Sequence, residues 1–330
     1  MIAQLHAQLP FELAVPEGEE FLLETYQVNE YAIQVGVPQR SDSAKTRPED
    51  EQITINGKQI YFADVLAIRF YKDSFSRGAG SEIDPPYSVI NFAIERHLER
   101  LKYVTQAAAI KSVEVPRCSW EMRYLEDDGS ELKEEEGKLR FRGSRAFELR
   151  WIWCDAHVWA DVLSLPEEFN PPQWRTLLTD AKGVLPHVGA SLVLTFTSLE
   201  VFISETLASL QSKNTVPGEL WQWINNRKNK LNNPSVEEGF SALLKMCCGH
   251  SLKEDKELWE CFKNLQTARN RFVHEGEARV GGKVVDSDRA LQFIGAAERI
   301  TEVIREWLPE DVRWPTFQRK VELRFSKKIT

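Results

Sequence analysis

The sequence lacks the marks of membrane, secreted and metal-binding proteins. No run approaches the ~18–20 consecutive apolar residues of a membrane span, and residues 1–6 show no basic segment leading into an apolar run, so no signal peptide is expected. The five cysteines are scattered and never spaced C-x-x-C, which disfavours a disulfide framework and a zinc site. We therefore expect a cytoplasmic protein without membrane contact, metal or cofactor.

The chain also lacks a net positive charge. Its net charge is −8 over 330 residues, whereas proteins that coat nucleic acid through phosphate contacts are usually basic. Any contact with RNA should therefore be local. The length is sufficient for two domains, each with a core of its own.

The first half has the alternation of β structure. Asn56-Gly57 separates two alternating segments, 52–55 and 58–62, and is a strong hairpin signal. Another strand is expected at 31–35. Further elements predicted in this half are a helix at 88–107 and strands at 120–124, 139–142 and 147–153.

Arginines alternate with aromatic residues between 139 and 153. Such a pattern can hold single-stranded nucleic acid by stacking and phosphate contact. It is also what a sheet with one buried aromatic face and one solvated face requires, and we favour this second interpretation. His97 and His157 are isolated, and a structural role is expected for both. Residues 1–185 show no nucleotide loop or nucleophile elbow, and we expect them to form an α+β sensor, regulatory or substrate-selecting domain.

The second half has helical periodicity. Four helices are expected, at 190–210, 236–248, 256–274 and 290–308, and Gly276 is expected to end the third. The predicted fold class is therefore a two-domain protein, with an α+β domain of mainly antiparallel strands at 1–185 and an all-α helical bundle at 186–310. A boundary is placed near Pro186, and residues 311–330 form a basic tail that could touch RNA or dock on its own domain, with 321–325 alternating like an added strand.

The residues with chemical potential lie at the end of the third predicted helix, in the segment 269–276. Asn270 and His274 are four apart and share a helix face, while Arg269 lies about 140° around from His274. Arginine matches phosphate oxygens, and histidine transfers protons near neutral pH. With a polar orienting group they suffice for RNA cleavage by the neighbouring 2′-hydroxyl without a metal. The alternative is that both cations only complement the helix dipole.

The segment Arg269-Asn270-Arg271-Phe272-Val273-His274 resembles the Arg-x4-His signature of HEPN domains, with Asn after Arg and Gly soon after His. The helix order agrees: a long apolar first helix, the motif late in the third, and an amphipathic last helix. The resemblance covers roughly residues 187–308 and is closest to bacterial abortive-infection and phage-defence HEPN proteins, including the Apea-like type.

The resemblance implies a metal-independent endoribonuclease that acts as a homodimer through its helical domain, with one composite cleft. Arg269 would bind the scissile phosphate, His274 would act in acid–base or transition-state contact, and Asn270 would orient them. Arg269 of one chain could then meet His274 of the other. The products would carry 2′,3′-cyclic phosphate and 5′-hydroxyl ends.

Supporting cations are few. Arg271, Arg227, Lys228 and Lys230 are candidate RNA-binding residues, the last three in a polar segment that is equally typical of a solvated loop. Glu200 is an acid in the apolar first helix; it is either exposed or paired with Arg269.

Two functions follow. The first is an anti-phage defence or toxin endoribonuclease, with RNA as substrate and a regulatory protein or phage-derived trigger as partner. The second is a non-catalytic HEPN protein that serves RNA binding or dimerisation in a defence or toxin–antitoxin complex.

Overall fold

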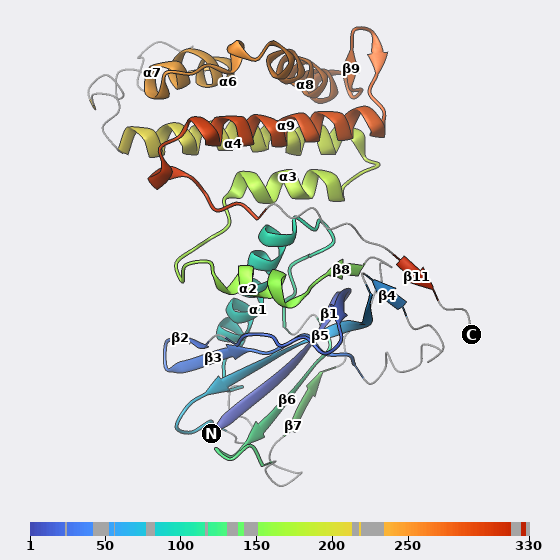
Figure 1. Ribbon diagram of the computed structural model, residues 1–330, viewed down its shortest axis with the longest axis vertical. Helices are drawn as coiled ribbons and strands as arrows, with labels where there is room; N and C mark the ends of the chain where they lie inside the picture. Colours follow the sequence, from blue (N-terminus) through green and yellow to red (C-terminus); the bar gives the residue numbers. More distant parts are fainter. Residues whose placement is uncertain are drawn as a thin grey trace. The chain divides into compact units, whose positions relative to one another are not determined.

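The computed structural model describes residues 1–23, 25–41, 53–55, 57–76, 83–115, 118–130, 138–141, 151–212, 218, 234–317 and 325–327 (Figure 1). Contacts divide the chain into two compact units. The sheet unit comprises Met1–Asn170 with Phe317–Thr330, and the helical unit comprises Pro171–Thr316. The predicted fold class is confirmed: an antiparallel sheet region over residues 2–125 is followed by a mainly helical region over residues 156–307.

The long strand β1 (Ile2–Pro16) organises the sheet. Alternate residues from Ala3 to Phe11 are buried, so one face of the strand lies in the core. It pairs antiparallel with β5 (Lys58–Tyr71) on one side and β6 (Trp120–Leu125) on the other. The main path of the sheet runs β11-β4-β5-β1-β6-β7. The remaining strands are β2 (Thr25–Val28), β3 (Tyr31–Val35), β4 (Ile53–Ile55), β7 (Lys138–Phe141), β8 (Trp151–Trp153) and β11 (Phe325–Lys327).

The strongest turn signal is correct. Strands β4 and β5 pair antiparallel around Gly57, which has a φ of +80° that glycine accepts without strain. Strand β3 has the predicted bounds. Strand β5 extends beyond the predicted end at residue 62 to Tyr71. Residues 63–68 are all buried, so the alternation on which the prediction rested does not continue there. Phe325 of β11 pairs with Ile55 of β4, so this part of the C-terminal segment belongs to the sheet.

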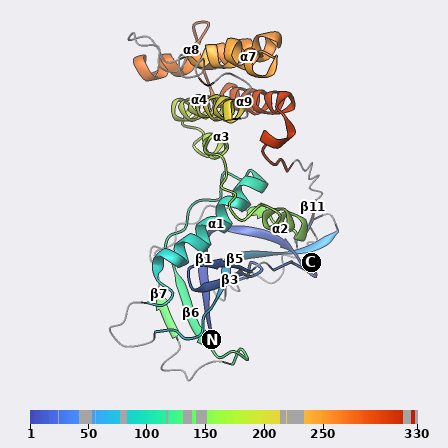
Figure 2. The same ribbon diagram turned by 90° about the vertical axis from the view of Figure 1, so that its left-hand side faces the viewer.

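Helices α1 and α2 lie in the described part of the sheet unit (Figure 2). Helix α1 (Tyr87–Thr105) has nearly the predicted bounds and packs its buried residues into the same core as β1 and β5. Helix α2 (Ala156–Leu163) was not predicted. Asp155 caps the start of this helix, and its side chain accepts a hydrogen bond from the Val158 amide at 2.8 Å.

The helical unit has α4 and α9 side by side between α3 and the layer of α7 and α8 (Figures 1 and 2). The four predicted helices are present, and the second contains a π-helical turn. The elements are α3 (Gln173–Gly183), α4 (Val188–Ser212), α6 (Val236–Glu238), a π-helix (Gly239–Leu243), α7 (Leu244–Cys248), α8 (Lys256–Glu275), the hairpin strands β9 (Arg279–Val280) and β10 (Lys283–Val284), and α9 (Ser287–Trp307).

Helix α3 moves the boundary between the units. The sequence placed the boundary near Pro186, but Trp174, Leu178 and Ala181 of α3 pack in the same core as α4 and α9. The division therefore falls between Asn170 and Pro171.

Among the described residues, α4 alone has the length and apolar composition of a membrane-spanning helix. Of its most apolar window, 44% is buried within the structure. A core helix passes the same test, so this feature does not distinguish a span from a core helix.

Candidate active site

The end of α8 positions the Arg-x4-His segment. Asp255 caps the start of the helix, which then runs without a break to Glu275, and Gly276 ends it with a φ of +79°. Because the helix is continuous, Asn270 and His274 lie on one face, and both are exposed. The helix does not unwind before Gly276, so Arg269 keeps its angular separation of about 140° from His274.

Arg269 points away from that face towards α4. Its guanidinium carbon lies 5.3 Å from the centre of the Phe196 ring, and Nη2 lies 3.9 Å from a carboxylate oxygen of Glu200. On its own helix, Nη1 donates a hydrogen bond of 3.0 Å to Oδ1 of Asn270. Of the two possibilities for Glu200, pairing with Arg269 is therefore the one observed.

The side chain of Arg269 is only partly buried. Its Nε is fully buried and has no hydrogen-bond partner among the described residues. The side chain as a whole is 27% exposed, and that of Glu200 is 34% exposed. Arg269 is therefore only partly covered by its neighbours, and guanidinium nitrogens match the geometry of phosphate oxygens.

Phe272 brings α8 unusually close to α4. A Cβ built on Gly189, in the first turn of α4, would lie 1.9 Å from Cε2 of the Phe272 ring. Only a residue without a side chain allows this approach. Gly189 thus sets the distance between α4 and the turn that carries Arg269 and His274, and nothing in the sequence pattern had singled it out.

His274 stands apart. Within the part of the chain that the structure describes, its ring makes no hydrogen bond or ion pair, and it is exposed. The structure thus brings Arg269, Asn270 and Glu200 together but leaves His274 on the outer face. Arg271 is half-buried, and Arg227, Lys228 and Lys230 lie outside the described residues.

No group of three or more His, Cys, Asp or Glu side chains is placed to hold a metal ion in the described ranges. Cys247 and Cys248 pack at the edge of the helical core. Burial raises the pKa of the Cys247 thiol to about 11 and also raises the pKa of Cys248. These thiols are therefore poor nucleophiles near neutral pH.

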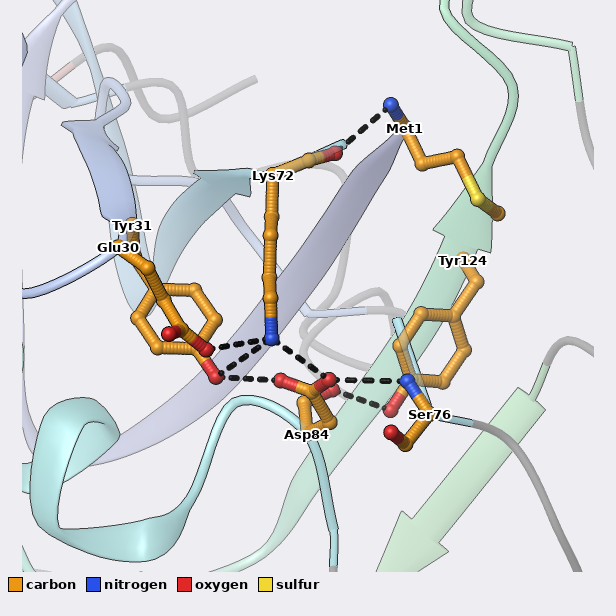
Figure 3. Close-up of polar contacts among 7 residues, drawn as sticks. All are labelled: Met1, Glu30, Tyr31, Lys72, Ser76, Asp84 and Tyr124. Carbon is orange, nitrogen blue, oxygen red and sulfur yellow. Dashed lines mark hydrogen bonds and ion pairs between the residues drawn. The ribbon is translucent and has the colours of Figure 1, made fainter. Parts of the chain in front are cut away.

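A second polar cluster lies in the sheet unit (Figure 3). Asp84 accepts hydrogen bonds from the Tyr31 hydroxyl at 2.5 Å, from the Ser76 amide at 2.9 Å and from Lys72 Nζ at 3.2 Å. Lys72 also pairs with Glu30 at 2.5 Å. The cluster was not predicted, because its members come from separate strands and from a segment, 72–86, whose composition indicates only a loop.

Further contacts join this cluster to the sheet. The Tyr124 hydroxyl donates to the Asp84 carbonyl at 2.6 Å, and the Met1 amino group donates to the Lys72 carbonyl at 3.0 Å (Figure 3). The ends of β1, β5 and β6 are thereby tied to the residues that precede α1.

The charged groups of the cluster are paired with one another. The hydrogen bond and ion pair between Lys72 and Glu30 raise the pKa of Lys72, and Asp84 and Tyr31 add to this effect. Burial would raise the pKa of Asp84, but the hydrogen bonds from Tyr31, Ser76 and Lys72 outweigh it and lower that pKa. Burial, with the bond to Asp84, raises the pKa of Tyr31 to about 12. Lys72 is therefore a cation near neutral pH rather than a nucleophile, and the cluster is structural.

A pocket in the sheet unit lies beside α1, away from the Arg-x4-His segment in the chain. It encloses about 270 Å³ of empty space, its open mouth included, and is lined by Tyr26, Val35, Arg96, His97, Arg100, Val162 and Leu163. Arg100 donates to the carbonyls of Leu165 and Glu167 at 3.2 and 2.8 Å, so it anchors the segment after α2. Burial, with Arg96 and Arg100 nearby, lowers the pKa of His97 to about 3. A neutral, buried His97 fits the structural role expected for it.

Comparison with protein-family models, with curated proteins and with solved structures found no match.

Proposed function

We propose that the chain is a metal-independent endoribonuclease, with its active site at the end of α8. The observation that carries the proposal is that Arg269 is oriented by Asn270 and Phe196 while part of its side chain stays exposed. An arginine held this way is pre-organised for a phosphate, since little side-chain freedom remains to be lost on binding.

The chemistry requires three events at the scissile phosphate. The 2′-hydroxyl loses its proton as its oxygen bonds to phosphorus, the P–O5′ bond breaks, and O5′ gains a proton. His274 is the residue proposed to take or give a proton, because an imidazole does both near neutral pH. Arg269 is proposed to stabilise the negative charge of the phosphorane. The products would be a 2′,3′-cyclic phosphate and a 5′-hydroxyl.

A second copy of the chain is part of this proposal. Arg269 faces α4 and His274 lies on the outer face of an unbroken helix, so the two side chains of one chain do not converge. Two copies with their α8 ends facing each other would let Arg269 of one copy meet His274 of the other. We therefore propose a homodimer through the helical unit, with RNA bound between the copies.

The biological setting is proposed from the HEPN resemblance alone. An RNase of this kind would serve anti-phage defence, abortive infection or a toxin system, and a regulatory protein or phage-derived trigger would control it. Residues 1–170, with the returning strand β11, would supply the sensing or substrate-selecting part.

One observation favours a non-catalytic function instead. The Glu200 carboxylate lies near the charge of Arg269 and links α4 to α8, which is what a purely structural arginine would show. In that case the helical unit would serve dimerisation or RNA binding in a defence or toxin–antitoxin complex.

Cleavage of labelled RNA in EDTA distinguishes the two functions. The wild type should produce 2′,3′-cyclic phosphate ends, and Arg269→Ala and His274→Ala should each lower the rate at least about a hundredfold. Arg299→Ala and His250→Ala, which remove one exposed Arg and one exposed His elsewhere in the helical unit, should leave it unchanged. Absence of cleavage by the wild type, even with lysate of phage-infected cells added, would exclude the nuclease proposal.

A further inference from the structure

Glu200 is the acidic group that faces the proposed phosphate-binding arginine. Helix α4 carries two acids, Glu200 and Glu205, on an otherwise uncharged helix. Glu200 lies beside the Nη edge of Arg269, which is the edge that would bind a phosphate.

The distance shows that Glu200 does little to orient Arg269. Charge-assisted hydrogen bonds between a guanidinium and a carboxylate are about 2.7–2.9 Å long, whereas this pair is separated by 3.9 Å. The hydrogen bond to Asn270 and the Phe196 ring already fix the guanidinium. What Glu200 adds is a negative charge 3.9 Å from the guanidinium.

We infer that Glu200 opposes phosphate binding at Arg269, and that RNA must push its carboxylate aside to engage the guanidinium. The inference rests on the proposed function and adds to it a restraint built into α4. A phosphate oxygen that approached Nη2 would come within a few ångströms of the carboxylate, where two like charges repel. The site would thus be held at low affinity for single phosphates.

The restraint would be small enough for a substrate to overcome. The side chains of Arg269 and Glu200 are 27% and 34% exposed, so solvent screens the charges. The repulsion is then of the order expected for charges about 4 Å apart in water. Removing the charge of Glu200 should therefore tighten phosphate binding by about fivefold. An RNA with several phosphate contacts can supply that difference, whereas a mononucleotide cannot.

The experiment measures binding of a fluorescent 2′-O-methyl RNA oligonucleotide by anisotropy in EDTA at low salt. The methyl group blocks the nucleophile, so binding is read without cleavage. Glu200→Gln should lower the Kd about fivefold and raise cleavage of ordinary RNA at subsaturating concentration by a similar factor. Glu205→Gln, an exposed acid on the same helix, is the matched control and should change neither.

Two further results separate this inference from the nuclease proposal. In an Arg269→Ala background, Glu200→Gln should lose its effect, because a phosphate no longer binds beside Glu200. If the wild type cleaves and binds but Glu200→Gln binds no more tightly, or more weakly, Glu200 is not a restraint and only the inference fails. If no variant binds the oligonucleotide or cleaves RNA, the proposed function fails and this inference fails with it.

Discussion

Replacing Gly189 by alanine tests the close approach of α4 to the Arg-x4-His segment. The added methyl group would lie 1.9, 2.2 and 2.3 Å from three atoms of the Phe272 ring. No packing of carbon atoms allows such distances, so the ring, the helix or both must move. Phe272 lies between Arg269 and His274 in sequence, and a displacement there changes the turn that carries both.

The magnitude follows from two opposing terms. Forcing an extra methyl group into a packed contact costs about 1–3 kcal/mol. In the other direction, alanine stabilises a helix by up to about 1 kcal/mol relative to glycine. We expect a net loss of about 1–2 kcal/mol in the free energy of unfolding, which for a unit of this size is a fall in Tm of about 2–8 °C.

Thermal unfolding followed by circular dichroism at 222 nm measures this change, because the helical unit dominates the signal. Gly295→Ala in α9 is the matched control, since a Cβ there meets nothing within 4 Å. It should leave Tm unchanged or raise it slightly. Adding Phe272→Leu to Gly189→Ala should cost less than the sum of the two single changes. If Gly189→Ala is as stable as Gly295→Ala, the contact is not rigid and the reasoning is refuted.

Two predictions concern the sheet unit. Asp84→Asn should lower the free energy of unfolding by about 2 kcal/mol at pH 7, because Lys72 loses a buried carboxylate partner but keeps Glu30. Since the pKa of Asp84 is lowered on folding, its contribution to the free energy of unfolding is present above the ordinary carboxyl pKa and is lost as pH falls through the folded value. Urea unfolding should therefore show a smaller difference in stability between the variant and the wild type at pH 3 than at pH 7. An equal difference at both pH values would contradict this. The pKa of His97 is lowered from 6.5 to about 3, so below pH 6.5 the unfolded chain binds a proton that the folded one does not, and stability should fall by up to about 1.4 kcal/mol per pH unit. His97→Phe should remove that part of the slope, whereas an unchanged slope would show that His97 is not its source.

Local chemistry was the predictable part of the fold. Asn56-Gly57 indicated the β4–β5 hairpin, and Gly276 marked the end of α8, because both depend on backbone conformations that few residues adopt. The helices of the second half were visible because their apolar residues recur every three to four positions. Helix α2 was missed, although Asp155 is a capping residue, because the helix is only 8 residues long.

Long-range contacts were not predictable in the same way. The Lys72–Asp84 cluster depends on tertiary placement, and no periodicity reveals that Tyr31 and Tyr124 meet at one carboxylate and its backbone. For the candidate site, the sequence supplied the residue types and the angle between Arg269 and His274. It did not show that Phe196 lies against the guanidinium, or that Gly189 controls how closely the two helices approach.

The pairing of β11 with β4 means that the helical unit is inserted, in sequence, between two parts of the sheet unit. The sheet unit is encoded by two stretches, one before and one after the helical unit, so this strand pair can form only after residues 325–327 have left the ribosome. A chain cut after Thr316 would leave the backbone groups of β4 that now bond to β11 without that partner, and an unpaired strand edge invites association with other chains. Ribosomal synthesis thus passes through the whole helical unit before β11 can join the sheet.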